Sequence, residues 1–301
     1  MKATPHRRVT KAIIPAAGMG TRLLPATKSQ PKEMLPVGRK PVIQYVVEEI
    51  VAAGVHQVLV VTSQQKRAIE AHFDPDPALE DRLKNGHYSL DVLRHVEMDV
   101  QLFYTRQSIP RGLADAIARA EHFVDGAAFL VCLGDSILRA PTTGAALRRL
   151  IETHEREKAA ATVLFETVAR EEVVRYGIAA PEGAPGPAFR CAGLVEKPAV
   201  DEAPSTLAVA GRYVFEPVVF DYIRKTPPGR GGEIQITDSM RLMIEDGLPV
   251  WGVRMESDEH RLDIGNYKSY FRAFFDLSLA DPEFGDDFRA YVHERLRETE
   301  G

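Results

Sequence analysis

The feature that most constrains this fold is a short apolar strand that leads directly into a glycine loop and spaced cations. Residues 11–15 read Lys-Ala-Ile-Ile-Pro, and a continuous apolar run of this kind is typical of a buried parallel strand. Gly18 and Gly20 follow, and glycines allow backbone N–H groups to approach phosphate oxygens without a Cβ in the way. Arg22 and Lys32 then add positive charge. The segment predicts a binding site for a triphosphate.

Two commoner phosphate-binding motifs do not fit this loop. The dinucleotide fingerprint requires a third glycine where Leu23 stands, and the Walker loop requires a Gly-Lys-Ser/Thr sequence where Leu23-Leu24-Pro25 stands. Two glycines alone are equally compatible with a simple tight turn. The prolines at positions 25, 31 and 36 favour the phosphate site, because each fixes φ and so restricts the loop that carries the cations.

The composition indicates a soluble globular protein. The 301 residues are 45% hydrophobic and 27% charged, enough for a large core in one main domain. The net charge of −5 argues against a broad nucleic-acid-binding surface, and no apolar stretch is long enough to span a membrane. The basic residues Lys2, Arg7 and Arg8 precede no signal-peptide core, so we expect a cytoplasmic protein. Cys132 and Cys191 lie in apolar strands and are expected to be buried free thiols.

Strands and helices alternate along the chain, which predicts an α/β fold with ligands at the carboxyl ends of the strands. The sequence predicts strands at 11–15, 58–62, 101–105, 128–133, 160–165, 192–195 and 208–215. It predicts helices at 41–53, 112–121, 143–158, 217–225, 267–279 and 288–300, and a helix up to Ile244 with Thr237 as its N-cap. Residues 73–100 are predicted to be a helical excursion over the sheet edge, and 181–187 the tip of a hairpin.

The run from 15 to 36, with its Pro-Ala-Thr-Lys and Lys-Glu-Met-Leu-Pro pieces, resembles the signature loop of the sugar-phosphate nucleotidylyltransferases. Within that family it is most similar to the bacterial enzymes that use UTP and glucose 1-phosphate. The resemblance extends over about residues 10 to 280. It implies a Rossmann-like nucleotidyltransferase fold, with a mixed, mostly parallel central sheet flanked by helices. The residues that it matches to the nucleotide are Ala16, Ala17, Gly18, Gly20, Thr21, Arg22, Lys32, Gln107 and Gly112.

Asp135 and Asp263 match the two magnesium-binding aspartates of the family. Asp135 follows Gly134 at the end of a predicted buried strand, which is also a common place for a turn residue. Asp263, in Asp-Ile-Gly-Asn, indicates little by itself among 43 acidic residues. The resemblance therefore implies Mg²⁺ as the cofactor. One or two protein carboxylates are sufficient for a cation that bridges phosphates.

Glu196-Lys197-Pro198 resembles the motif with which the family binds the sugar phosphate, although by itself it would be interpreted as an exposed charge pair. In the family the glutamate binds sugar hydroxyls and the lysine binds the phosphate. Because neighbouring side chains of a strand point to opposite faces, both charges can enter one site only if the chain turns there. Tyr176, Gly177 and Gly211 are further candidates for this part of the site, and Glu233 and Gln235 are expected at its edge.

One segment departs from the uridylyl pattern. Gln107 resembles the glutamine that reads the edge of the base, but Ala114 and Asp115 stand where the uridylyl enzymes usually have glycine and histidine. The thymidylyl enzymes are closer at this point. The excursion at 73–100 and the sequence Lys32-Glu33-Met34 favour uridine.

The resemblance implies transfer of a uridylyl group from UTP to glucose 1-phosphate, giving UDP-glucose and pyrophosphate. The resemblance assigns catalytic roles to Arg22, Lys32, Asp135 and Lys197. The alternatives are a thymidylyltransferase that uses dTTP, another hexose 1-phosphate as acceptor, and, more remotely, a non-catalytic subunit that binds nucleotide sugars. We expect one α/β domain over 1–265, with a sugar-binding part at about 166–215, and a C-terminal helical segment at 266–301 packed on it. The family is commonly a homodimer or homotetramer, and no nucleic-acid or membrane partner is expected.

Overall fold

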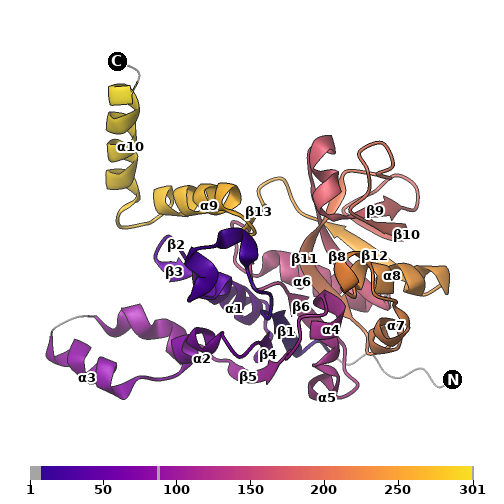
Figure 1. Cartoon of the computed structure of the whole chain (residues 1–301), viewed down its shortest axis with the longest axis horizontal. Helices are drawn as coiled ribbons and strands as arrows, with labels where there is room; N and C mark the ends of the chain where they lie inside the picture. The colour runs from indigo at the N-terminus through magenta and orange to yellow at the C-terminus, as the bar shows by residue number, and fades with distance from the viewer. Residues whose placement is uncertain (1–7, 87–88, 300–301) are drawn as a thin grey trace.

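The computed structural model describes residues 8–86 and 89–299, and Lys2 and Arg7 lie outside them. Its centre is a nine-stranded sheet that separates two layers of helices (Figure 1). The strands lie in the order β5 (Gln101–Arg106), β4 (Gln57–Thr62), β1 (Lys11–Pro15), β6 (Phe129–Cys132), β11 (Leu207–Phe215), β8 (Ala161–Thr167), β12 (Val250–Arg254), β10 (Ala188–Glu196) and β9 (Gly177–Pro181).

The sheet is mixed but mostly parallel, as predicted. β5, β4, β1, β6, β8, β12 and β9 run in one direction, whereas β11 and β10 run in the other. β1 lies between β4 and β6 in parallel register, with Ile13 opposite both Leu59 and Val131. A strand in this position is covered on both faces, which explains its continuous apolar sequence. The glycine loop therefore begins at the carboxyl edge of the sheet centre.

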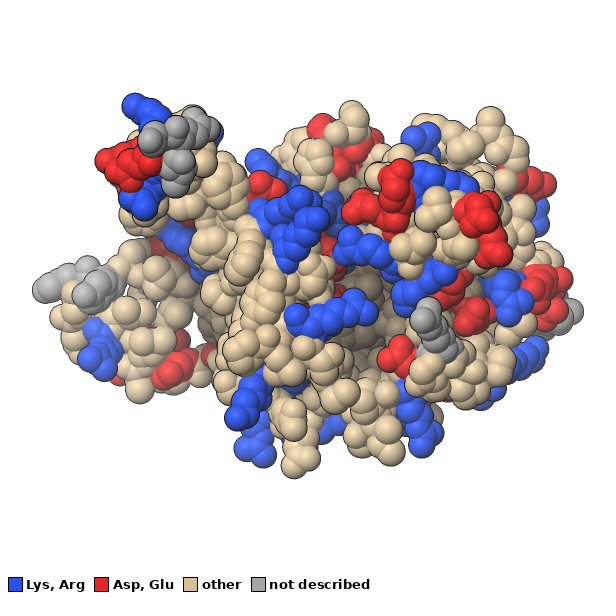
Figure 2. All heavy atoms as spheres, turned by 45° about the horizontal axis from the view of Figure 1, so that its top comes forward, with Lys and Arg blue, Asp and Glu red and all other residues tan. Residues whose placement is uncertain are grey.

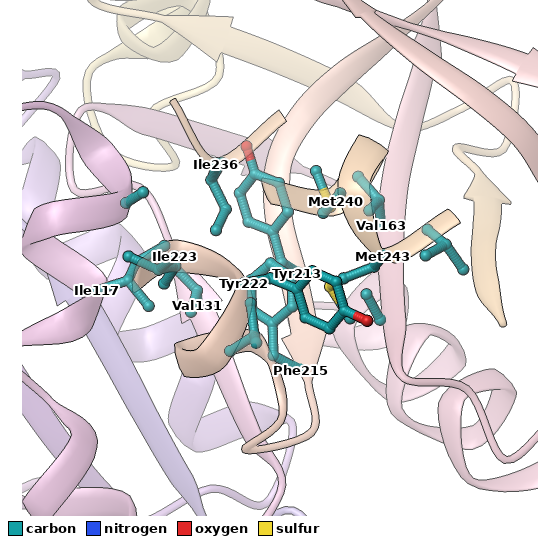
Figure 3. Packing of buried hydrophobic residues seen from close by; sticks show 14 of the residues in the cluster. Ile117, Val131, Val163, Tyr213, Phe215, Tyr222, Ile223, Ile236, Met240 and Met243 are labelled. Carbon is teal, nitrogen blue, oxygen red and sulfur yellow. The ribbon is translucent and has the colours of Figure 1, made fainter. Parts of the chain in front are cut away.

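Helices cover both faces of the sheet. α1 (Val42–Ala52), α2 (Arg67–Phe73) and α6 (Ala145–Arg156) pack on one face, and the core there includes Ile14, Ile43 and Leu147. α4 (Leu113–Ala118), α5 (Glu121–Val124), α7 (Val219–Lys225) and α8 (Ile236–Glu245) pack on the other. Figure 3 shows this second core, in which Met240 and Met243 of α8 approach Tyr213 of the sheet. The sheet thus carries two separate apolar layers.

Several short elements lie at the carboxyl edge of the sheet. The loop after β1 contains the 3₁₀ turns η1 (Thr21–Leu23), η2 (Ala26–Lys28) and η3 (Lys32–Met34), followed by the ribbon of β2 (Pro36–Val37) and β3 (Lys40–Pro41). β7 (Ser136–Arg139) pairs with β13 (His260–Asp263) in a second antiparallel ribbon. Two further 3₁₀ turns, η5 (Arg170–Arg175) and η6 (Arg230–Gly232), precede β9 and α8.

The segment predicted at 73–100 forms helices over 77–85 and 90–97, with residues 87 and 88 outside the described part, but its predicted position over the sheet edge is wrong. α3 (Pro77–Asn85) and η4 (Leu90–Glu97) contain no buried residue among those described. Leu79 and Leu90 have exposed fractions of 40% and 37%, so the leucines do not cover the sheet. The segment instead extends from the body beside α2 and β5 (Figure 1).

The two C-terminal helices differ in their packing. α9 (Tyr267–Leu279) lies against the β2–β3 ribbon, where the Tyr267 and Tyr270 hydroxyls donate hydrogen bonds to the carbonyls of Leu23 and Pro36. α10 (Gly285–Thr299) projects away from the body (Figure 1), and Gly285 at its start is buried, whereas its other residues of described burial are not. Of the segment predicted at 266–301, α9 packs on the domain, α10 contacts α9 through the rings of Phe275 and Phe288, and residues 300 and 301 lie outside the described part.

No helix in the described part of the chain is both long and apolar enough to cross a bilayer. Cys132 and Cys191 are buried free thiols, as the sequence predicts.

Candidate active site

A cavity of about 750 Å³ opens at the carboxyl edge of the sheet. Its walls come from the loop after β1, the loop after β6, the middle of β11, the end of β10 and the start of α8. On the face shown in Figure 2, Lys and Arg side chains gather around a hollow. The predicted site residues that line the cavity are Gly20, Thr21, Arg22, Lys32, Asp135, Tyr176, Gly177, Glu196, Lys197, Gly211, Glu233, Gln235 and Asp263.

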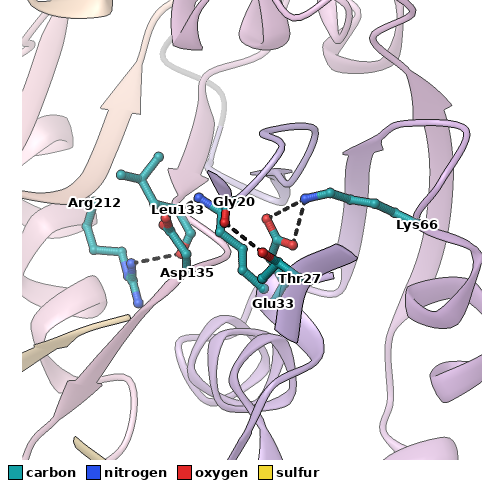
Figure 4. A network of polar contacts seen from close by, with 8 residues as sticks. Gly20, Thr27, Glu33, Lys66, Leu133, Asp135 and Arg212 are labelled. Atoms are coloured by element: carbon teal, nitrogen blue, oxygen red, sulfur yellow. Dashed lines mark hydrogen bonds and ion pairs between the residues drawn. The ribbon is translucent and has the colours of Figure 1, made fainter. Parts of the chain in front are cut away.

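The glycine loop is held by its own side chains. Gly20 has φ 67°, a conformation that favours glycine, and a Cβ there would lie 3.3 Å from the Thr27 side chain. The Thr27 hydroxyl donates a hydrogen bond of 2.8 Å to the Gly20 carbonyl (Figure 4). Ala16, Ala17 and Gly18 precede this turn and do not line the cavity. Of the predicted nucleotide loop, only the part from Gly20 onward reaches the cavity wall.

Lys32 and Asp135 form an ion pair inside the cavity. Lys32 Nζ lies 2.5 Å from Asp135 Oδ2, and the two residues come from the loops after β1 and β6. Burial opposes a charge on either group. The neighbouring carboxylates of Asp135 and Glu33 nevertheless raise the pKa of Lys32. The Lys32 ammonium in turn lowers the pKa of Asp135, despite its burial. Both groups are therefore charged at neutral pH.

A second ion pair lies behind this loop. Lys66, which precedes α2, donates to both carboxylate oxygens of Glu33 at 2.8 and 2.7 Å (Figure 4). Both side chains are buried, with exposed fractions of 6% and 1%. Burial raises the pKa of Glu33 and lowers that of Lys66, while their mutual attraction opposes both shifts. The pair connects the loop after β4 to the residue next to Lys32.

The β7–β13 ribbon brings Asp263 beside the loop that carries Asp135. Asp263 lies opposite Ser136 in the ribbon, and Ile264 N–H donates to the Asp135 carbonyl at 3.1 Å. Both carboxylates line the cavity. Burial, and to a smaller extent the negative charge of Asp135, raise the pKa of Asp263, although Arg261 opposes the shift. A pair of carboxylates in one cavity is a donor set that suits Mg²⁺.

The Glu196-Lys197 pair enters the same cavity because the chain turns there. Lys197 has φ 48°, and its N–H donates to the Tyr176 carbonyl at 2.9 Å. Its ammonium lies 2.9 Å from Glu196 Oε1. A Cβ on Gly177 would lie 2.9 Å from Thr237 Oγ1 and 3.2 Å from Glu196 Oε2. Because Gly177 has no side chain, there is room for the Glu196 carboxylate at the cavity wall.

Gln107 and Gly112 lie outside the cavity wall, although Leu113 lines it. Gln107 is 3% exposed, and its amide nitrogen donates to Asp115 Oδ2 at 2.7 Å and to the Gly112 carbonyl at 3.2 Å. The other Asp115 oxygen accepts from Arg119 at 2.6 Å. Gly112 has φ 103°, and a Cβ there would lie 2.5 Å from the Ile234 carbonyl. Asp115, the residue that departs from the uridylyl pattern, therefore fixes the Gln107 amide.

Comparisons with known proteins agree with this geometry. A family model described as nucleotidyl transferase matches residues 11–278. The chain belongs to the nucleotidyl transferase family. A UTP–glucose-1-phosphate uridylyltransferase of Bacillus subtilis is 40% identical over 297 residues, which cover 98% of this chain and 99% of that protein. The protein of that name from Staphylococcus epidermidis is 39% identical over 291 residues, or 96% and 99% of the two chains.

Among solved structures, a UTP-bound UGPase from Acinetobacter baumannii superposes with a TM-score of 0.87 at 34% identity. The match covers 95% of this chain and 99% of that one. Within the nucleotidyl transferases, these relatives place the chain with the uridylyl enzymes and not with the thymidylyl alternative.

The residues of this nucleotidyl transferase that line the cavity and that sequence reasoning missed include Arg175, Tyr213 and Arg261. Arg261 stacks over the Tyr176 ring at 4.8 Å and pairs with Glu166, while Arg175 lies 3.9 Å from Asp263 Oδ2. The nearby carboxylates raise the pKa of Arg261 against the effect of burial. Every second residue of a strand faces the same way, so Tyr213 and Arg261 could have been found as the residues two positions from the predicted Gly211 and Asp263.

The predicted role of Thr237 as an N-cap is wrong. α8 begins at Ile236, its N-cap position is Gln235, and no side chain caps it. Thr237 lies within the first turn, lines the cavity and approaches Gly177. Asp238 does lie in the first turn, as expected.

Proposed function

We propose that this chain transfers the uridylyl group of UTP to glucose 1-phosphate and forms UDP-glucose and pyrophosphate. The observation that carries the proposal is one cavity lined by the cations Arg22, Lys32 and Lys197 and the carboxylates Asp135 and Asp263. Two polyanionic substrates repel each other, and a cavity of this charge pattern can hold both of them. The relatives' names indicate which nucleotide and sugar these are.

The reaction requires little proton chemistry. A phosphate oxygen of glucose 1-phosphate attacks the α-phosphorus of UTP, a new P–O bond forms, and the bond to the β-phosphate breaks with its electrons leaving on pyrophosphate. The nucleophile is already an anion, so no general base is needed. Catalysis then depends on positioning and on stabilising charge in the transition state.

The proposed roles follow from position in the cavity. Arg22 and Lys32 bind the triphosphate, Lys197 binds the phosphate of the sugar, and Glu196 accepts hydrogen bonds from sugar hydroxyls. Asp135 and Asp263 would hold Mg²⁺, whose positive charge would neutralise phosphate oxygens. In the described ranges, no group of three or more His, Cys, Asp or Glu residues is placed so that it could hold a metal ion by itself. This agrees with an ion that takes its other ligands from phosphate and water.

The test is pyrophosphate release from the purified protein with each combination of five nucleotides (UTP, dTTP, CTP, ATP and GTP) and three sugars (glucose, galactose and N-acetylglucosamine 1-phosphates). We expect the highest kcat/KM with UTP and glucose 1-phosphate. A preference for dTTP would contradict the assignment of uracil as the base. A preference for another sugar phosphate would contradict the assignment of glucose 1-phosphate as the acceptor. Tight UDP-glucose binding without turnover would favour the non-catalytic alternative.

Assembly into a homo-oligomer through the C-terminal helices is part of the proposal. α9, α10 and the turn between them expose large apolar side chains, and the exposed fractions of Phe271, Phe284, Tyr291 and Leu296 are 63%, 53%, 56% and 54%. Exposed apolar surface of this kind is typical of a protein–protein contact. We place the enzyme in the cytoplasm, which agrees with the two buried free thiols.

A further inference from the structure

Arg212 is a buried charge that the proposed mechanism does not use. It is the largest fully buried side chain of those described, with an exposed fraction of 0%. Its neighbours in β11, Gly211 and Tyr213, line the cavity, whereas the Arg212 side chain enters the layer between the sheet and α1. Arg212 therefore cannot touch the substrates.

Glu49 of α1 neutralises this charge. Arg212 Nη2 and Nε lie 2.7 and 3.2 Å from Glu49 Oε2, and the Glu49 side chain is only 4% exposed. A buried ion pair of this kind usually gains little stability over apolar side chains of the same volume, because both ions lose their hydration. The pair therefore calls for an explanation other than stability.

The remaining guanidinium donors bind the backbone around Asp135. Nη2 donates to the Ser136 carbonyl at 2.8 Å. Nη1 donates to the Leu133 carbonyl at 3.4 Å, as Figure 4 shows. These two carbonyls flank Asp135, whose own carbonyl accepts from Ile264 N–H. The fixed fork of an arginine can reach both carbonyls while it pairs with Glu49, which the single ammonium of a lysine cannot do.

We propose that Arg212 is a positioning residue: paired with Glu49, it holds the carbonyls of Leu133 and Ser136, before and after Asp135 in the chain, and so fixes the direction of that carboxylate for cation binding. The proposal rests on the proposed function, because it assumes that Asp135 binds the divalent cation. Hydrogen-bonding partners behind a ligand typically change metal affinity about 10- to 100-fold. Arg212 is expected to act in this way through the backbone.

The test measures Mn²⁺ binding by electron paramagnetic resonance in the presence of UTP, without glucose 1-phosphate. Two variants are compared with the wild type: Arg212→Lys, and the double variant Arg212→Met with Glu49→Leu, which leaves no buried charge. Arg149→Lys is the matched control. Arg149 donates to both oxygens of Glu259 at 2.8 and 2.7 Å, and neither of these two residues lines the cavity.

We expect both Arg212 variants to weaken Mn²⁺ binding about tenfold. We also expect kcat to fall while the KM for glucose 1-phosphate stays within twofold of the wild type, a split that a general loss of structure would not give. The control should bind Mn²⁺ like the wild type. Wild-type Mn²⁺ affinity in either folded Arg212 variant would overturn the proposal. If circular dichroism shows that neither variant folds, the role of the pair is structural and the proposal is wrong.

The same Mn²⁺-binding measurement distinguishes a failure of the proposed function from a failure of the role proposed for Arg212. In that case the wild type itself would bind no Mn²⁺ beyond what UTP binds in solution, and Asp135→Asn would change nothing.

Discussion

Lys32 Nζ and Asp135 Oδ2 lie 2.5 Å apart, so the cation that we expect to bind the triphosphate is paired with the carboxylate that we expect to bind Mg²⁺. Each group keeps the other charged in a buried position. The pair joins the loops after β1 and β6 across the centre of the parallel strands. The same two residues therefore connect the expected triphosphate site to the expected Mg²⁺ site.

Replacement of Lys32 by methionine tests its role. We expect kcat/KM for pyrophosphate release to fall about 10²- to 10³-fold, the usual cost of losing one group that stabilises transition-state charge. Lys84→Met is the control, because Lys84 is exposed on α3. A loss of less than tenfold in the Lys32 variant would show that this ammonium does not stabilise the reacting phosphates.

Asp115 provides a second prediction. Because Asp115 fixes the Gln107 amide at 2.7 Å, Asp115→Asn should loosen the residue that we expect to read the base. We expect the KM for UTP to rise about fivefold, which corresponds to about 1 kcal/mol, while the KM for glucose 1-phosphate is unchanged. Steady-state kinetics with each substrate varied in turn measure this. An equal change in both KM values would argue against a role in base binding.

Site residues could be predicted together from the sequence when they lie close to one another along the chain, and less well when they lie far apart. The loop from Gly20 to Lys32 is continuous, so its residues could be identified together. Asp135 and Asp263 could be paired through the resemblance, but their place in one cavity depends on the β7–β13 ribbon, which could not be predicted from the sequence. Arg212 was missed because a charge inside an apolar strand has no sequence pattern that identifies its partner.

The fold was predictable where the apolar pattern is strong. β1, β4 and β6 are buried on both faces, and each appears as a continuous apolar run. The position of α3 was not predictable, because helical spacing of leucines indicates a helix but not what the helix contacts. The start of α8 was placed two residues too late, because the hydroxyl of Thr237 fits an N-cap equally well by sequence.

The C-terminal helices give a prediction about assembly. If α9 and α10 form the contact between subunits, then the double variant Phe271→Ser with Tyr291→Ser should dissociate, because it removes two large exposed apolar side chains. Sedimentation velocity should show a shift from oligomer to monomer. Val92→Ser on η4 is the control, since Val92 is 66% exposed but lies outside these helices. A wild-type protein that is already monomeric would contradict the proposed assembly.

His72 gives a prediction about pH. Burial lowers its pKa to about 4, and the adjacent ring of His95, stacked at 4.3 Å, adds to the shift. The unfolded chain, with the ordinary value of 6.5, binds more protons than the folded protein between pH 6.5 and 4. Stability should therefore fall as the pH decreases through this range. The melting temperature of His72→Gln should depend less on pH than that of the wild type, and equal slopes would contradict this explanation.

The most direct test of the central claim is the metal dependence of turnover in the wild type and in Asp263→Asn. ³¹P NMR follows UDP-glucose and pyrophosphate formed from UTP and glucose 1-phosphate, with EDTA added first and Mg²⁺ then restored in excess. We expect EDTA to stop the reaction, excess Mg²⁺ to restore it, and Asp263→Asn to require about tenfold more Mg²⁺ than the wild type or the exposed control Asp258→Asn. Turnover that continues in EDTA, or an Asp263→Asn variant with the wild-type Mg²⁺ requirement, would contradict the account.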